Sequence, residues 1–201
     1  VTLAGGSLTN QGEINGLNLY STYQALNNGA AGRLLADGQL SLAGQSVVND
    51  GVLAAQTLSL TGDSLKNQGE IQGDNALTLN VAESRNDGTL HTGGMLDWQG
   101  AGLVNNGLIS ATALLLDLSR EVNNTADGRA IASDTLTLRA PVLQNSGLLA
   151  ASRLELLVPT ITNSGTLQGT RTLSATGTRL TNQQNGIFNG TKESRMCAHQ
   201  K

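Results

Sequence analysis

The chain has little of the side-chain chemistry that most enzymes and cofactor proteins use. Its 201 residues include one cysteine, two histidines, one tryptophan, two tyrosines and one phenylalanine. A single cysteine, Cys197, excludes an internal disulfide framework. His91 has no second histidine or cysteine at a matching position elsewhere in the chain, so no metal site and no cofactor are predicted.

Charge and long apolar runs are scarce as well. Charged residues make up 13% of the chain and the formal net charge is -3, so no basic stripe is available for a nucleic acid. No apolar run is long enough to span a bilayer, and no transmembrane segment is predicted. The chain opens directly on Val1-Thr2-Leu3 without the pattern of a signal peptide, which favours an internal fragment of a longer protein.

Asparagine, in contrast, recurs at a nearly constant interval. Ten copies are separated by steps of 18 to 21 residues: Asn10, Asn28, Asn49, Asn67, Asn86, Asn105, Asn124, Asn145, Asn163 and Asn182. A fixed period of this kind indicates a stack of short units, each of which buries its apolar side against the next.

The repeated unit has the pattern of short β-strands. Leucines alternate with other residues in Leu58-Ser59-Leu60, Leu77-Thr78-Leu79 and Leu136-Thr137-Leu138, which places the leucines on one face of a strand. Helical repeats run to about 33 residues or more, so a unit of about 19 residues predicts one coil of a parallel β-helix.

Most asparagines are followed two residues later by glycine, which predicts a sharp corner between strands. The predicted turn positions are Asn10 and Gly12, Asn49 and Gly51, Asn67 and Gly69, Asn86 and Gly88, Asn105 and Gly107, Asn145 and Gly147, and Asn163 and Gly165. Both residue types tolerate positive φ, so we expect positive φ at Gly69 and its counterparts, and only a mild effect of asparagine at Gly69. The asparagines serve either as a ladder between coils or as plain turn residues.

These patterns predict an all-β fold of about ten coils, with residues 1–190 as one repeat domain about 48 Å long. Residues 191–201 lose the pattern, and we expect an atypical tail that is disordered or foreign to the domain.

A longer period of 96 residues relates the two halves of the repeat domain. Asn28, Gly32 and Arg33 recur as Asn124, Gly128 and Arg129, which indicates that a block of five coils was duplicated. The extra residues in these corners predict protrusions, and protruding corners are where solenoids usually bind partners. Arg33 and Arg129 are therefore candidate partner contacts, and local ion pairs with Asp37 or Asp127 are the alternative.

Parallel β-helices also include polysaccharide lyases and hydrolases, so a polysaccharide-degrading or glycan-binding protein is the alternative function. Such sites need converging carboxylates. Here the acids are scattered, about one in each coil: Glu13, Glu70, Asp97, Asp117 and Glu155. Tyr20 and Tyr23 form either a binding platform or a packing contact across a corner, and Trp98 takes the place of a core leucine. No catalytic residues are predicted.

The repeat resembles the haemagglutinin repeats of two-partner-secreted proteins of Gram-negative bacteria, which include filamentous haemagglutinin adhesins and contact-dependent growth inhibition toxins. The resemblance rests on Leu8-Thr9-Asn10-Gln11-Gly12-Glu13-Ile14, Leu65-Lys66-Asn67-Gln68-Gly69-Glu70-Ile71 and Ile161-Thr162-Asn163-Ser164-Gly165-Thr166-Leu167, each leading to a leucine-rich strand. It covers residues 1–190.

The resemblance implies a right-handed β-helical filament that is secreted through an outer-membrane transporter and stays at the cell surface. It implies a rigid shaft for adhesion or for delivery of a C-terminal toxin, and a host-cell or bacterial receptor or glycan as partner. No Asn-Pro occurs in the chain, so the family's secretion-domain motif is absent and a shaft segment is expected.

Overall fold

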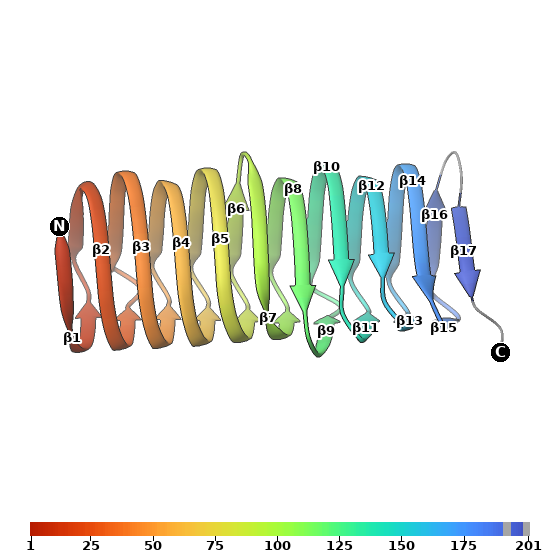
Figure 1. Cartoon of the computed structure of the whole chain (residues 1–201), viewed down its shortest axis with the longest axis horizontal. Coiled ribbons are helices and arrows are strands. Elements are labelled where there is room, and N and C mark those ends of the chain that lie inside the picture. Colours follow the sequence, from red (N-terminus) through yellow and green to blue (C-terminus); the bar gives the residue numbers. More distant parts are fainter. Residues whose placement is uncertain (191–193, 199–201) are drawn as a thin grey trace.

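A computed structural model describes residues 1–190 and 194–198, and shows one parallel sheet wound into a rod. The described residues form seventeen strands and no helix. In Figure 1 the chain descends along the front of the rod, ascends along the back and advances from one end to the other, which makes the winding right-handed. The predicted parallel β-helix is confirmed.

The strands follow one another around successive coils, and some run through an entire coil. Their bounds are β1 (Thr2–Asn10), β2 (Glu13–Asn28), β3 (Arg33–Asn49), β4 (Val52–Asn67), β5 (Glu70–Asn86), β6 (Thr89–Thr92), β7 (Met95–Asn105), β8 (Leu108–Leu118), β9 (Glu121–Asn124), β10 (Arg129–Arg139), β11 (Val142–Asn145), β12 (Leu148–Leu157), β13 (Thr160–Asn163), β14 (Thr166–Gly177), β15 (Arg179–Asn182), β16 (Ile187–Gly190) and β17 (Ser194–Ala198).

Equivalent side chains of successive coils stack into columns, because each strand pairs in parallel with its copy one coil on. Leu40 aligns with Leu58, Leu58 with Leu77 and Leu77 with Leu96, and all four are fully buried. Trp98 lies in a neighbouring inward column between Leu79 and Leu116 and is also fully buried. The alternating leucine side chains therefore face the core, and Trp98 is a core residue.

The asparagines form a continuous ladder through the rod. Each side-chain amide donates from Nδ2 to the Oδ1 of the asparagine one coil on, at 2.8 to 2.9 Å, from Asn10 through to Asn182. Asn67 Nδ2 also lies within hydrogen-bond distance of the carbonyl oxygens of Gly69 and Thr89. One side chain thus joins the corner of its own coil to the next coil, so the ladder and turn roles are both filled.

The corner glycines do not have the predicted positive φ. No glycine among the described residues lies in that region, so the expectation for Gly69 and its counterparts was wrong. The reason for glycine is instead the close stacking of coils, because a Cβ on Gly69 would lie 2.1 Å from the carbonyl oxygen of Gly51. Gly88 meets the carbonyl of Gly69 in the same way, at 2.2 Å. An asparagine side chain at Gly69 would meet the same carbonyl, so the mild effect expected for it is also withdrawn.

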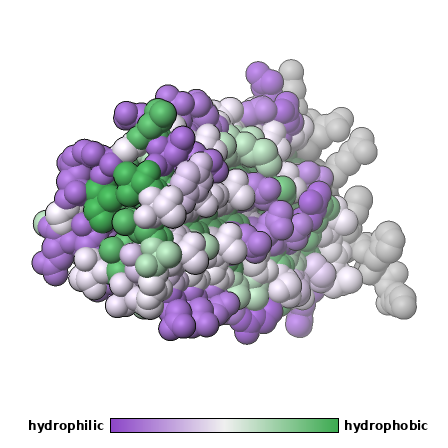
Figure 2. Space-filling model, turned by 60° about the vertical axis from the view of Figure 1, so that its left-hand side comes forward, coloured by the Kyte–Doolittle hydropathy of each residue, from purple (hydrophilic) through white to green (hydrophobic). Residues whose placement is uncertain are grey.

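The expected tail falls partly outside the described residues, which exclude 191–193 and 199–201. Between them, β17 pairs in parallel with β14, so the sheet continues into the segment where the repeat pattern is lost. Figure 2 shows hydrophobic residues gathered at the near end of the rod and mostly hydrophilic or intermediate residues along its side. Within the described part of the chain, no helix is long and apolar enough to cross a membrane.

Candidate contact surface at the wide corners

Three corners are two residues longer than the others, at residues 29–32, 125–128 and 183–186, and we call them the wide corners. In each, the last backbone N–H donates to the carbonyl of the first residue, as from Gly32 to Gly29 at 2.7 Å and from Gly128 to Thr125 at 2.9 Å. The ladder asparagine still reaches the glycine, since Asn28 Nδ2 donates to the Gly32 carbonyl at 3.1 Å. The extra residues are therefore accommodated outside an unbroken ladder.

The first two wide corners are 96 residues apart, as the sequence indicated, but the third breaks this period. Subtracting 96 from Asn182 gives Asn86, which is followed by the short corner Asp87-Gly88. The two preserved copies each end in an exposed arginine, Arg33 or Arg129, at the start of a strand.

Arg33 and Arg129 differ in their surroundings. Arg33 Nε lies 3.7 Å from Glu13 Oε2, and both side chains are about half exposed. The predicted local ion pair thus forms, but with Glu13 of the preceding coil and not with Asp37. The neighbours of Arg129 in the stack are Leu108 and Leu148, and no ion pair of Arg129, with Asp127 or any other residue, occurs in the described structure.

The residue that follows each corner lies in one outward column, which we call the leading column. From the first coil to the tenth it contains Glu13, Arg33, Val52, Glu70, Thr89, Leu108, Arg129, Leu148, Thr166 and Ile187. Two residues further along each strand lies a second outward column, which contains Asn15, Leu35, Ala54, Gln72, His91, Ser110, Ile131, Ala150, Gln168 and Asn189. Together the two columns form the leading face of the rod.

The arginines on this face were predicted from the sequence, but the aliphatic residues beside them were not. Leu35 and Val52 are partly exposed next to Arg33, and Ile131 and Leu148 are partly exposed next to Arg129. These pairs are again 96 residues apart, from 35 to 131 and from 52 to 148. Combining that period with the inward and outward alternation of a strand would have found them.

The acidic side chains and His91, which were considered for catalysis or metal binding, do not converge on one site. Asp117 Oδ2 lies 3.8 Å from Arg139 Nη1, and Glu155 accepts a hydrogen bond from Thr137. His91 Nδ1 lies 2.7 Å from Ser110 Oγ on the exposed leading face. No group of three or more possible metal ligands occurs in the described part of the chain.

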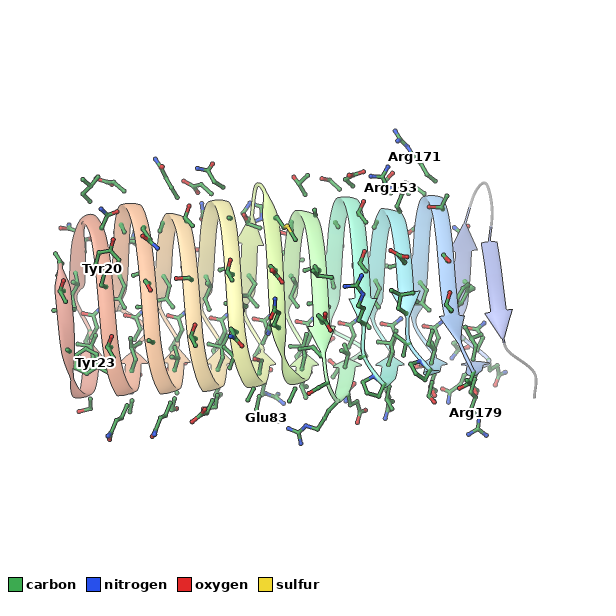
Figure 3. The ribbon with its side chains drawn as sticks, viewed as in Figure 1. Tyr20, Tyr23, Glu83, Arg153, Arg171 and Arg179 are labelled. Atoms are coloured by element: carbon green, nitrogen blue, oxygen red, sulfur yellow. The ribbon has the colours of Figure 1, made fainter. Side chains whose placement is uncertain are left out.

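The two tyrosines do not form a shared platform. Tyr20 is 43% exposed and its hydroxyl donates to Gln39 Oε1 at 3.4 Å. Tyr23 packs over Gly5, where an added Cβ would lie 2.9 Å from the ring. Figure 3 shows the two side chains well apart along the same strand. Tyr23 packs on Gly5, its partner in the paired strands β1 and β2, so the contact lies between coils and not across a corner.

One carboxylate at a narrow corner has a perturbed pKa. Burial alone would raise the pKa of Asp87, but hydrogen bonds from Arg85 and Asn106 and the charges of Arg85 and Lys66 outweigh it and lower the pKa below its ordinary value of 3.8. Asn106 also accepts a hydrogen bond from Thr125 at 2.6 Å, so the surface bonds link three successive coils. The lowered pKa therefore reflects a local structural network at the corner.

Comparisons with known proteins point to one group. The chain is 31% identical to Toxin CdiA of Escherichia coli over 73% of its length, 33% identical to Deoxyribonuclease CdiA of Dickeya dadantii over 75%, and 32% identical to tRNA nuclease CdiA of Yersinia mollaretii over 89%. It spans only 6%, 5% and 6% of the lengths of these relatives. No family model matches the chain, and no solved structure matches it.

The ten-coil solenoid and its ladder define a haemagglutinin-repeat shaft of the two-partner-secreted class. Within that class, the chain belongs to the family of contact-dependent growth inhibition exoproteins that contains the CdiA proteins. The nuclease activities named for the relatives are those of whole proteins, of which the matched region is a small part.

Proposed function

We propose that this chain is a rigid spacer in the filament of a cell-surface exoprotein of a Gram-negative bacterium. The unbroken asparagine ladder supports this role, because it fixes the spacing and orientation of ten coils over about 48 Å. In this proposal the whole protein reaches the surface through an outer-membrane two-partner-secretion transporter. The shaft then carries the toxic and receptor-binding parts away from the producing cell.

The proposal assigns no catalysis to this segment. Five of its acidic side chains pair with an arginine within the described residues, as Glu13 does with Arg33 and Asp134 with Arg153. No group of three or more acids, histidines or cysteines converges there. The dispersed acids favour a structural role over the alternative of a polysaccharide-degrading enzyme.

A deletion that keeps the coils in phase tests the spacer role. Removing residues 50–105 from the full exoprotein joins Asn49 to Asn106, reproduces the natural Asn105-Asn106 junction, keeps Arg33 and Arg129, and shortens the rod by three coils, about 14 Å. We expect surface display and inhibition of target cells to persist, because only the length changes. Deleting residues 34–120 is the control, since it joins Arg33 to Glu121, puts the coils out of phase and is expected to reduce display.

Loss of inhibition by the in-phase deletion at normal surface display would contradict the spacer role. It would mean that the removed coils carry a specific binding or catalytic site.

We also propose that the leading face contacts a partner through Arg33 and Arg129. The free guanidinium of Arg129 supports the larger contribution from that residue, because Arg33 already has Glu13 as a counter-charge. Substituting Arg129 with alanine should weaken attachment to target cells more than Arg33→Ala does. Equal attachment of both variants and the parent, measured by cell counting, would place the contact elsewhere.

A further inference from the structure

The leading face carries more large aliphatic side chains than the other outward surfaces of the rod. Six of them lie on its two columns: Leu35, Val52, Leu108, Ile131, Leu148 and Ile187. Each is partly or fully exposed, although most of the leucine and isoleucine of this chain is buried in the core. Such a strip is unusual on a lone rod and is typical of a surface that meets another protein.

The charges on this face lie only in the leading column. Glu13 and Arg33 neutralise each other within the chain. Glu70 in the fourth coil and Arg129 in the seventh have no ion pair within the described residues. They are three coils apart, about 14 Å at the spacing of strands, which is too far for them to pair with each other.

Two copies of the leading face can meet across a two-fold axis in two ways. With the rods parallel, the leading column of one copy faces the second column of the other at the same height, which sets Arg129 against Ile131. With the rods antiparallel, the leading column faces itself with the order of coils reversed. Only the antiparallel arrangement brings acid and arginine together between copies.

We propose that the leading face binds the same face of a second copy of this chain, antiparallel, with the axis between Thr89 and Leu108. The fourth coil then meets the seventh, so Glu70 faces Arg129 of the second copy, and the reciprocal pair forms as well. The third coil meets the eighth, so Val52 faces Leu148. Each unpaired charge gains a partner, and Val52 and Leu148 cover one another in both reciprocal contacts. Leu35, Leu108 and Ile131 lie opposite the uncharged side chains of Gln168, Thr89 and Gln72.

Shifting the two antiparallel copies by one or two coils gives less favourable charge contacts. A shift of one coil in one direction places Glu70 against Leu108 and Val52 against Arg129, and a shift in the other direction places Glu70 against Leu148. A shift of two coils places Arg33 against Arg129, which are like charges. The charge pattern therefore selects one register across all ten coils.

The size of the face sets the strength of the contact. Ten coils by about four residues give roughly 600 Å² for each copy, or about 1,200 Å² in total, which is the lower end for a specific interface. The pairing is therefore weak and reversible. It rests on the proposed contact role of Arg129 and names a second copy of this chain as the partner. It is tested on purified chains, so its failure can be told apart from a failure of attachment to target cells.

Charge reversal tests the pairing. Sedimentation equilibrium of the whole chain at low salt should show a monomer–dimer equilibrium, and Glu70→Arg or Arg129→Glu should each raise the dimer dissociation constant at least tenfold. Combining both changes restores opposite charges and should return the constant to within about threefold. Arg179→Glu is the matched control, because Arg179 is exposed on strand β15 outside the leading face, and we expect less than a threefold change.

Cysteine cross-linking tests the direction. With Cys197 replaced by serine, oxidation of a mixture of Val52→Cys and Leu148→Cys chains should give a disulfide-linked dimer, and neither chain alone should do so. In a parallel pair, Val52→Cys would instead cross-link with Ala54→Cys. A chain that stays monomeric at all concentrations, a dimer that is insensitive to Glu70→Arg, or the parallel cross-link would each overturn the proposal. Circular dichroism of every variant confirms that the rod is folded.

Discussion

Glycine occupies the narrow corners because the carbonyl oxygen of the preceding coil takes the place of its missing side chain. Around Gly69 the nearest atoms to a Cβ would be backbone atoms of Gly51 and Asp50, at 2.1 to 2.8 Å, and backbone cannot move aside as a flexible side chain can. Gly12, in the first coil, would meet nothing within 4 Å. Gly12 and Gly69 have the same local sequence, but only Gly69 lacks room for a side chain.

We therefore expect Gly69→Ala to lower the free energy of unfolding by on the order of 1 to 3 kcal/mol, which is typical of overpacking. Gly12→Ala should change it by less than about 0.5 kcal/mol, as surface substitutions usually do. Urea unfolding followed by circular dichroism measures both. If the two variants unfold alike, stacking does not explain the glycines.

At this scale, the sequence predicted the positions but not the reason for glycine. The interval between asparagines suggested a ladder, because identical residues in successive coils stack, but it left plain turn chemistry open as the alternative. The clash at Gly69 is with Gly51, 18 residues earlier, and depends on how closely two coils approach. Local turn propensity contains no information on that distance, and it misleadingly suggested positive φ.

The predicted Asn-x-Gly corners do separate successive strands, but β2 to β5 are 16 or 17 residues long where short strands were expected. The wide corners are insertions that leave the ladder intact. Asn49 Nδ2 reaches the carbonyl of Gly51 at 3.2 Å across a narrow corner, and Asn124 Nδ2 reaches that of Gly128 at 3.1 Å across a wide one. The amide contact is the same although two residues have been added.

Deleting Ala126 and Asp127 should convert this wide corner into a narrow Asn-Thr-Gly corner without loss of the fold. We expect the free energy of unfolding to change by less than about 1 kcal/mol, because the core columns and the ladder are unchanged. Thermal unfolding measures it, and deletion of Leu136 and Thr137 from strand β10 is the control that should unfold the rod. A large loss of stability from the corner deletion would show that the wide corner supports the coil.

The candidate contacts could be predicted only in part at the level of elements. The 96-residue period drew attention to Arg33 and Arg129 as equivalent positions. Their difference comes from the residue one coil below, which is Glu13 for one arginine and Leu108 for the other. That neighbour is known only once the register of the strands is known.

The whole molecule is a one-dimensional stack, in which each coil mainly contacts the coils directly before and after it. Its stability is therefore expected to be a sum of local terms that decreases toward both ends of the isolated chain. In hydrogen exchange, amides of β5, β7 and β8 should be protected most and those of β1 and β15 least. Uniform protection from the first coil to the tenth would indicate a single cooperative unit instead.

The asparagine ladder also gives the rod an electrical direction. Every side-chain amide in it donates toward the C-terminal side and accepts from the N-terminal side, so the small dipoles of ten amides add along the axis. Asn10 keeps its oxygen toward one end, where it accepts the N–H of Gly12, and Asn182 directs its nitrogen to the carbonyl of Gly186 at the other. Two such rods joined head to tail continue the same row of dipoles. Joined head to head, they would set oxygen against oxygen, so engineered rods of this type can be lengthened in only one sense.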